Sequence, residues 1–427
     1  MTKSKHPLLL FAAPYFAPAY HGGVVQIYLG LLTRLKRYRV VVVADRCNTS
    51  LAALQEWDAL AKQRYGLDVE RVDAFEFHMD DRKMGPIGSL VQLARFLWQG
   101  RRQWQELCNK YSPDAVVCGG TYSAGWLMKN LPKRTALVNY IHGEELTMAV
   151  KPRFLAPFMH HWQHRCIRRA DMNLSVSSYT AHLVSRMTGA PVEKSKILSN
   201  FIDLNRFHIS GKRAELRAGY GWQDKTVLLT VARLEKRKGI DQVLRGLEVL
   251  KRQEKLSPSW RYVIGGKGPE HDALVQLVKE LELTEYVEFL GFVPDEDLPG
   301  LYESADVFVQ PNREINGDTE GFGVVFLEAN ACGLPVIGGE AGGTADAIAH
   351  GRTGFRVNGE LVYEIAAAIS ILMENDELRT RLGQQAVEWA ANFDVNKAVH
   401  RFENLMDEAL FKHGAAPRNL TSVSADI

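Results

Sequence analysis

Two glutamates enclose a glycine loop and the start of an apolar segment in the run Glu320-Gly-Phe-Gly-Val-Val-Phe-Leu-Glu328. The glycines let the backbone turn sharply and leave its amides uncovered. The apolar residues 324–331 predict a buried helix that ends before Gly333. The first N–H groups of a helix lack intrahelical acceptors and carry partial positive charge, so they attract phosphate. An anion site between two carboxylates suits a nucleoside-diphosphate sugar, which carries a diphosphate between two sets of hydroxyls.

A basic loop, Arg233-Leu-Glu-Lys-Arg-Lys238, lies between a predicted strand and a predicted helix. Fixed cations stabilise the charge that grows on a diphosphate leaving group. We therefore predict that Arg233 and Lys238 bind such a group, and that Lys236 and Arg237 are the exposed residues of the loop. The alternative is that the whole segment is an ordinary exposed basic loop.

Three further candidate groups follow predicted strands, where parallel sheets bind ligands. Glycine pairs let a ligand approach the backbone closely, and a histidine can exchange hydrogen bonds there. The alternatives are an ordinary turn and a structural histidine. The candidates are Gly22 and Gly23 at the start of the first helix, the turn that begins at Gly265, and His142 at the end of the strand 136–141.

With these segments the chain resembles the retaining glycosyltransferases of family 4, which have the GT-B fold. The family resemblance covers nearly the whole chain. Two patches, His142-Gly-Glu-Glu and residues 320–337, are similar to bacterial phosphatidylinositol-mannoside mannosyltransferases. The resemblance implies two doubly wound Rossmann-like domains that face a central cleft, with a C-terminal helix that crosses back to the first domain.

The resemblance also implies roles for individual residues. Glu320 would position the donor sugar, Glu328 would bind the ribose, and His142 would contact the sugar near the reacting centre. No second carboxylate is needed, because the acceptor attacks the face from which the diphosphate leaves, and the leaving oxygen can take the acceptor's proton. The remaining donor-binding residues would be Arg233, Lys238, Gly22 and Gly23 at the diphosphate, Gly265 and Val293 beside the nucleotide, and the amides of Gly321, Phe322, Gly323, Val324 and Val325.

Short apolar runs alternate with amphipathic segments along the chain, a pattern typical of α/β domains with parallel sheets. We predict strands at 8–13, 39–44, 115–118, 136–141, 172–176 and 196–200, and then at 226–232, 262–265, 287–290, 306–309 and 335–337. The predicted domains are an acceptor-binding domain (1–205, completed by a helix at 394–412), a donor-binding domain (214–393) and a disordered tail (413–427). The segment 200–213 is predicted to link the domains.

The composition indicates a globular cytoplasmic protein. Of 427 residues, 46% are hydrophobic, yet the apolar runs are too short to span a membrane. Prolines interrupt the N-terminal apolar run, which predicts a strand and not a signal peptide. Five scattered cysteines fit reduced thiols.

The charge is unevenly distributed. Residues 1–200 hold 27 Lys and Arg against 15 Asp and Glu, a net charge of +12, whereas residues 201–427 have a net charge of −10. Basic segments with aromatic residues, at 34–39, 95–102 and 153–169, predict an anionic acceptor or membrane surface for the first half. Ordinary surface charge is the alternative. Nucleic-acid binding ranks low because no recognised module is present.

No metal or cofactor is predicted. The run Asp295-Glu-Asp297 resembles a metal motif, but its place before an apolar segment is typical of a helix N-terminus. His160, His161, His164 and Cys166 lack a second ligand pair at metal spacing.

We therefore predict a retaining, metal-independent hexosyltransferase that uses GDP-mannose or UDP-glucose. Its acceptor would be a glycan or lipid-linked molecule of cell-surface polysaccharide or glycolipid synthesis, reached from the cytoplasmic membrane face. The alternatives are a GT-B-fold epimerase that hydrolyses its sugar nucleotide and a non-catalytic subunit that binds one.

Overall fold

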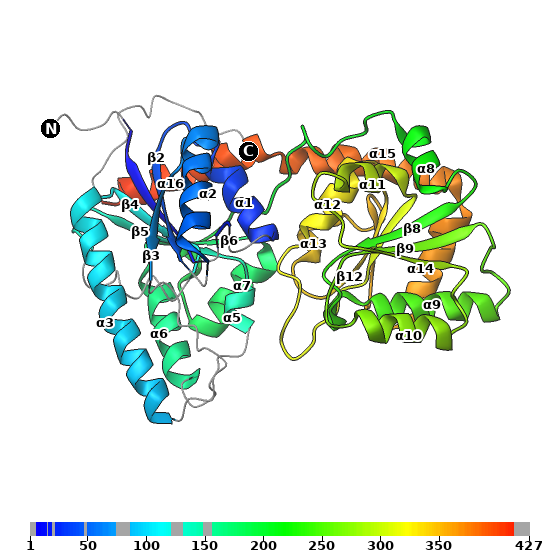
Figure 1. The fold of residues 1–427 in the computed structure, drawn as a ribbon, viewed down its shortest axis with the longest axis horizontal. Helices are drawn as coiled ribbons and strands as arrows, with labels where there is room; N and C mark the ends of the chain where they lie inside the picture. Colours follow the sequence, from blue (N-terminus) through cyan, green and yellow to red (C-terminus); the bar gives the residue numbers. More distant parts are fainter. Residues whose placement is uncertain are drawn as a thin grey trace. The chain divides into compact units, whose positions relative to one another are not determined.

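The computed structural model describes residues 6–14, 16–18, 22–46, 49–73, 86–120, 131–147 and 156–413. The chain forms two compact units (Figure 1): residues 1–198 with 398–427 make the first, and residues 199–397 make the second. The tail predicted at 413–427 lies outside the described residues, apart from His413. No helix within the described ranges is long and apolar enough to cross a lipid bilayer.

The first unit contains a seven-stranded parallel sheet with the order β3-β2-β1-β4-β5-β6-β7. The order reverses between β1 and β4, and such switch points are where α/β sheets bind ligands. The strands are β1 (Leu8–Ala13), β2 (Arg39–Asp45), β3 (Asp68–Val72), β4 (Ala115–Cys118), β5 (Ala136–Ile141), β6 (Met172–Ser175) and β7 (Ser195–Ile197). The helices are α1 (Gly23–Leu32), α2 (Leu51–Tyr65), α3 (Pro86–Tyr111), α5 (Glu144–Thr147), α6 (Ala156–Arg169), α7 (Ser178–Thr188) and, from Ala398 onward, α16 (Val395–Phe411).

Helices cover both faces of this sheet. Successive side chains of a strand point to opposite faces. Leu10 and Ala12 of β1 join an apolar core with α3 and α6, whereas Phe11 faces Tyr28 of α1, with 4.9 Å between ring centroids. Because both faces are buried, the central strands β1, β2, β4 and β5 are mostly apolar runs, which is why these strands could be predicted from the sequence.

Two carboxylates fix helix α16 to the first unit. Oε1 of Glu403 accepts hydrogen bonds from the backbone N–H groups of Lys36 at 2.8 Å and Arg37 at 2.7 Å, and its Oε2 accepts one from Arg37 Nε at 3.0 Å. Asp407 accepts hydrogen bonds from the Arg37 guanidinium and the Tyr38 hydroxyl. The buried side of the helix carries Phe402, Leu405, Met406, Ala409 and Leu410. The last helix therefore completes the first unit.

We expect Glu403→Ala to loosen helix α16. The substitution leaves two backbone donors without their acceptor, a loss of about 1–3 kcal/mol for buried groups. Limited proteolysis should then cleave α16 faster than in the wild type. Glu408→Ala is the matched control, because Glu408 is on the same helix but 41% exposed, in an ion pair with Lys196 at 3.3 Å. Equal cleavage of the Glu403 variant and the wild type would contradict this anchoring role.

The second unit contains a six-stranded parallel sheet with the order β10-β9-β8-β11-β12-β13, which reverses between β8 and β11. The strands are β8 (Thr226–Val231), β9 (Trp260–Gly265), β10 (Val287–Gly291), β11 (Val307–Gln310), β12 (Val336–Gly339) and β13 (Gly354–Val357). The helices are α8 (Arg213–Tyr220), α9 (Ile240–Arg252), α10 (His271–Glu280), α11 (Leu298–Ser304), α12 (Val324–Ala331), α13 (Thr344–Ala347), α14 (Val362–Glu374) and α15 (Asp376–Ala390).

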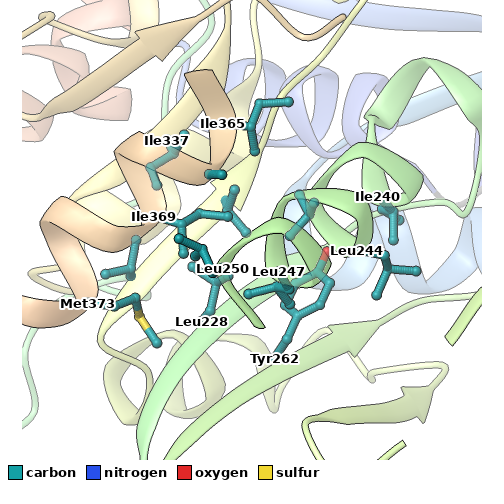
Figure 2. Close-up of a cluster of buried hydrophobic side chains, with 14 of the residues drawn as sticks. Leu228, Ile240, Leu244, Leu247, Leu250, Tyr262, Ile337, Ile365, Ile369 and Met373 are labelled. Carbon is teal, nitrogen blue, oxygen red and sulfur yellow. The ribbon is translucent and has the colours of Figure 1, made fainter. Parts of the chain in front are cut away.

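A large apolar core lies between this sheet and helices α9 and α14 (Figure 2). Val307 and Val309 of β11 belong to it, whereas Phe308 between them points to the other face. There Phe308 meets Tyr302 of α11 and Phe326 of α12, with ring centroids 5.8 and 5.7 Å away. The core members labelled in Figure 2 are Leu228, Ile240, Leu244, Leu247, Leu250, Tyr262, Ile337, Ile365, Ile369 and Met373.

The two doubly wound sheets confirm the predicted α/β architecture, although strands β3 and β13 were not predicted. Both lie at an edge of their sheet. Edge strands are often short and carry charged residues. Three of the five residues of β3 are charged (Asp68, Glu70 and Arg71), and β13 has four residues, one of them Arg356. The apolar-run criterion therefore does not detect them.

The segment predicted as a linker, residues 200–213, packs on the second unit. Phe207 is buried, and its ring centroid lies 6.1 Å from that of Tyr302. Arg213, which opens the unpredicted helix α8, donates to the Asp306 carboxylate at 2.6 Å. The partner of Arg213 stands just before strand β11, about ninety positions later in the chain, so the local sequence does not reveal this contact.

Candidate active site

Glu320 is the centre of a polar cluster in the second unit. Its Oε2 accepts hydrogen bonds from Lys238 Nζ at 2.6 Å, Asn312 Nδ2 at 3.0 Å and Arg237 Nη1 at 3.2 Å. These donors come from the loops after β8 and β11, the strands that flank the switch point. Among the described residues none donates to Oε1, so this second oxygen can accept from the hydroxyls of a ligand.

The Glu320 carboxylate is ionised at neutral pH. Burial by itself raises the pKa of Glu320, but the charges of Lys238 and Arg237 outweigh it and hold this pKa below the ordinary value for glutamate. Only 16% of the Glu320 side chain and 12% of each cation are exposed. Within the described chain, Glu320 is the only anion paired with Lys238, so the carboxylate occupies a position that a phosphate oxygen could take.

The structure corrects the expected exposure of Arg237, whereas the ligand-binding role of Arg233 stays a prediction. Arg237, predicted as exposed, is mostly buried, and its Nε lies 3.3 Å from carboxylate oxygens of both Glu235 and Asp318. Arg233, predicted to bind the ligand, is 72% exposed and lies 3.1 Å from Glu235. The loop therefore directs Lys238 and Arg237 into the polar cluster and leaves Arg233 at the surface.

Helix α12 begins directly after the glycine loop. Gly323 has a φ of 89°, a left-handed conformation that favours glycine, and a Cβ there would lie 2.6 Å from the Phe326 ring. Phe322 is buried and anchors the turn. The five residues predicted to stabilise a diphosphate through their amides, Gly321, Phe322, Gly323, Val324 and Val325, form this turn and the first two positions of the helix. Such a helix start favours an anion.

The glycine-rich turn after β9 has a structural explanation. Gly266 has a φ of 133°, and a Cβ there would lie 1.8 Å from the carbonyl oxygen of Ala232 in the loop after β8. A Cβ on Gly265 would lie 2.9 Å from Val293 Cγ2. The structure thus brings the candidates Gly265 and Val293 together, and the close approach of the Ala232 backbone and the Val293 side chain accounts for the two glycines without a ligand.

Glu328 lies outside the hydrogen-bonded cluster of Glu320. Its Oε2 accepts a hydrogen bond from the buried Tyr302 hydroxyl at 2.9 Å. Burial raises the pKa of Glu328 to about 7, although the Tyr302 hydroxyl opposes this shift. The sequence marked Glu328 as a ribose ligand but gave no sign of Tyr302, which comes from α11.

We expect Glu328→Gln to gain stability relative to the wild type as the pH rises. The folded protein binds a proton at Glu328 more tightly than the unfolded chain does, where the pKa of this carboxyl is 4.5. The contribution of Glu328 to stability therefore falls as the pH rises from 4.5 to about 7. Glutamine keeps an oxygen for Tyr302 and does not titrate. The melting-temperature difference, variant minus wild type, should be more positive at about pH 8 than at about pH 5. A difference that does not change with pH would contradict the raised pKa.

His142 follows β5 in the first unit and is buried. Its Nε2 lies 3.0 Å from the Tyr28 hydroxyl, which donates to the Gly119 carbonyl at 3.1 Å. Because the Tyr28 proton goes to Gly119, this pattern assigns a proton to His142 Nε2 and leaves Nδ1 as an acceptor. Burial lowers the pKa of His142 to about 4, so the imidazole is neutral near pH 7.

Glu145 holds the backbone on which His142 stands. Its two oxygens accept hydrogen bonds from the N–H groups of His142 at 3.0 Å and Gly143 at 2.8 Å. Burial raises the pKa of Glu145 to about 7. Glu145 was not among the predicted site residues, although a glutamate that accepts from the backbone N–H three residues before it is one half of a capping box.

Gly22 and Gly23 open helix α1. Gly22 has an extended backbone with a φ of −172°, which any residue can adopt. No heavy atom of the described residues lies within 4 Å of a Cβ built at either position. The first unit therefore does not require glycine here, and the proposed approach of a ligand stays a prediction.

The described part of the chain contains no group of three or more His, Cys, Asp or Glu side chains that could hold a metal ion. The rings of His160 and His164 lie 6.2 Å apart on α6. The Asp295-Glu-Asp297 run precedes α11, with Asp297 at its N-cap position. Whether the reaction needs a metal stays a prediction.

Two family models match the chain. The model described as "Glycosyltransferase Family 4" matches residues 21–206, and the model described as "Glycosyl transferases group 1" matches residues 212–389. Together they cover most of both units.

Individual proteins are also similar to this chain. The GDP-mannose-dependent alpha-(1-6)-phosphatidylinositol monomannoside mannosyltransferase of Mycolicibacterium smegmatis is 34% identical over 52% of this chain and 58% of its own length. D-inositol 3-phosphate glycosyltransferase 2 of Catenulispora acidiphila is 31% identical over 54% of each protein. The chain thus spans little more than half the length of these curated relatives. The crystal structure of Anabaena Alr3699/HepE in complex with UDP has a TM-score of 0.73 at 20% identity, over 94% of this chain and 100% of that one, which shows a common fold.

Proposed function

Because the chain belongs to glycosyltransferase family 4 and has the GT-B fold, we propose that it is a retaining glycosyltransferase. It moves a hexose from a nucleoside-diphosphate sugar to a glycan or lipid-linked acceptor. The observation that carries the proposal is the convergence of Lys238, Arg237 and Asn312 on Glu320, at the switch point of a parallel sheet and beside the start of α12.

The donor diphosphate is proposed to bind between the basic loop and the first amides of α12. Lys238 and Arg237 supply buried positive charge, and Arg233 supplies an exposed guanidinium whose partner among the described residues is Glu235. A diphosphate competes for these cations because it carries more charge than a carboxylate. The cations carry the growing charge of the leaving group, and we propose that no metal is required.

The transfer is proposed to keep the configuration of the sugar. The acceptor oxygen forms a bond to the anomeric carbon on the face where the bond to the diphosphate breaks, and the leaving diphosphate oxygen takes the acceptor's proton. Glu320 binds sugar hydroxyls through Oε1, and its charge favours the oxocarbenium-like transition state. His142, neutral because burial lowers its pKa to about 4, acts as a hydrogen-bonding group for the sugar and not as an acid.

The names of the relatives support a donor and an acceptor class. One relative is a GDP-mannose-dependent enzyme that acts on a phosphatidylinositol mannoside, and another is named for D-inositol 3-phosphate. We therefore propose mannosyl transfer from GDP-mannose to an acceptor that contains an inositol phosphate. UDP-glucose is the second donor to test.

The acceptor is proposed to be reached at an anionic, cytoplasmic membrane face by the basic first unit. Trp98 of α3 is 64% exposed and has the Arg102 guanidinium 5.9 Å from its ring centroid, and Phe158 of α6 is 43% exposed. Exposed aromatic and basic side chains on helices are typical of proteins that bind anionic lipid. Sedimentation with phosphatidylglycerol vesicles, weakened by salt and absent with phosphatidylcholine, would support this. Equal sedimentation with both lipids would contradict it.

The proposed function is tested by isothermal titration of the protein with GDP, UDP and their mannose and glucose conjugates, followed by transfer to inositol phosphate acceptors with and without EDTA. Binding of GDP-mannose and transfer that survives EDTA would support the proposal. Donor hydrolysis without transfer would favour the epimerase alternative, and binding without turnover would favour a non-catalytic subunit. Absence of binding to every nucleotide would overturn the donor site.

A further inference from the structure

We propose that Arg313 is a positioning residue of the donor site. It holds the backbone of the 3₁₀ turn η3 (Lys236–Lys238) so that the cations of that turn reach the diphosphate. This inference rests on the proposed function, because it takes the turn to be part of the donor site. The hydrogen bonds and ion pairs of the Arg313 side chain go to Lys236, Asp241 and Glu360, and Arg313 is not proposed to touch the substrate.

The contacts of Arg313 join the turn, the helix that follows it and, through an ion pair of Nη1 with Glu360 at 3.6 Å, the loop after β13. Its side chain is 7% exposed. Its backbone N–H donates to the Arg237 carbonyl at 2.9 Å, and its Nε donates to the Lys236 carbonyl at 3.1 Å. Its Nη2 donates to both oxygens of Asp241, at 2.9 and 2.8 Å, in the first turn of α9. One residue therefore connects the end of the turn to the start of the next helix.

The Lys236 carbonyl accepts the Gly239 N–H at 3.2 Å within the turn and the Arg313 Nε–H from outside it, whereas the Arg237 carbonyl accepts the Arg313 backbone N–H. Arg313 thus supplies one donor to each carbonyl, and its charge is compensated by Asp241 and Glu360. Lysine and arginine side chains are long and flexible, so where their charges lie depends on where their Cα atoms are held. A fixed turn thus pre-organises Lys238 and Arg237, and less conformational freedom is lost when a ligand binds.

Two successive residues of the loop after β11 contact the site from different sides. Asn312 donates to Glu320, whereas Arg313 fixes the turn that carries the cations opposite that carboxylate. The packing is tight, because a Cβ on Gly239 would lie 2.3 Å from the Pro311 carbonyl oxygen. This loop therefore sets the distance between the carboxylate and the cations.

The test compares Arg313→Gln with Arg217→Gln. Arg217 is a matched control: its side chain is 12% exposed, and it donates to the carbonyls of Ser304 and Trp222 and to the Asp306 carboxylate, at 2.7, 2.8 and 3.1 Å. Its partners precede β8 and β11, so Arg217 lies at the amino ends of these strands, whereas the loops of the donor site follow their carboxyl ends. Both substitutions should lower the melting temperature, but only one should disturb the donor site.

Titration with GDP and UDP, well below both melting temperatures, gives the deciding readout. We expect Arg313→Gln to raise the nucleotide Kd roughly tenfold, or about 1.4 kcal/mol, with a higher donor KM and a smaller change in kcat. Arg313→Lys should recover part of this, because an ammonium reaches Asp241 but does not reproduce the planar fork. Arg217→Gln should leave Kd unchanged.

Equal Kd values for the wild type and Arg313→Gln would overturn the positioning role, as would an equal rise in both variants. If the wild type binds neither nucleotide, the proposed function fails first and this inference falls with it. The two failures are therefore distinguishable in one titration series.

Discussion

Glu320→Gln is expected to bind GDP or UDP more tightly than the wild type and yet to lose transfer. In the ligand-free protein the carboxylate holds Lys238 at 2.6 Å and Arg237 at 3.2 Å, so it competes with an incoming diphosphate. Glutamine keeps the shape but removes the competing charge. We expect a threefold to tenfold lower Kd, the effect of roughly 1 kcal/mol.

The loss of transfer in Glu320→Gln has a different cause. A neutral amide cannot offset positive charge at the reacting sugar, and loss of one such electrostatic group lowers kcat by about 10²–10³. Isothermal titration and single-turnover transfer measure the two effects separately. Glu282→Gln is the control, because Glu282 pairs with Lys251 in the same unit but is 83% exposed. Weaker nucleotide binding by Glu320→Gln would show that the carboxylate does not compete with the diphosphate.

Lys238→Met is expected to lose both nucleotide binding and transfer. Methionine keeps most of the buried stem, so the substitution removes mainly the charge. The phosphate then lacks the cation that is paired only with Glu320 among the described side chains, and we expect kcat/KM to fall more than about 10²-fold, or about 2.7 kcal/mol. The effect on nucleotide affinity should thus be opposite in sign to that of Glu320→Gln.

Lys251→Met provides the control for Lys238→Met. Lys251 forms an ion pair with Glu282 at 3.1 Å on the surface of the second unit, and exposed pairs of this kind contribute little to stability. It should retain wild-type binding and transfer. A Lys238→Met protein with the nucleotide affinity of the wild type would remove Lys238 from the donor site.

The interior of the fold could be predicted from the sequence because burial on both faces leaves a continuous apolar signal. The run at 8–13 is strand β1, and the helix expected at 324–331 is α12. Strands β3 and β13 gave no such signal because an edge position tolerates charge. Helix α8 was missed because its arginines are held by groups at the start of β11, far along the chain.

The sequence could predict which loops form the site, but not which side chains of those loops point into it. In a parallel sheet the loops after β8 and β11 lie together at the carboxyl ends of the strands, and the glycine pattern predicts where α12 begins. Which arginine points inward is decided by carboxylates on another loop: Arg237 meets Asp318, whereas Arg233 remains at the surface. Tyr302 and Asn312 were missed because neither stands in a pattern typical of a site.

The place of helix α16 has a consequence for biosynthesis. The first unit is interrupted by residues 199–397, and its last helix is made after the whole second unit. At about 5–20 residues per second, this interval lasts roughly 10–40 s on the ribosome. During that time Arg37 and Tyr38 lack their hydrogen-bond acceptors, the carboxylates of Glu403 and Asp407. The surface that α16 later covers is accessible to chaperones. A nascent chain stalled before residue 398 should therefore be protease-sensitive in its first unit and become resistant once α16 emerges.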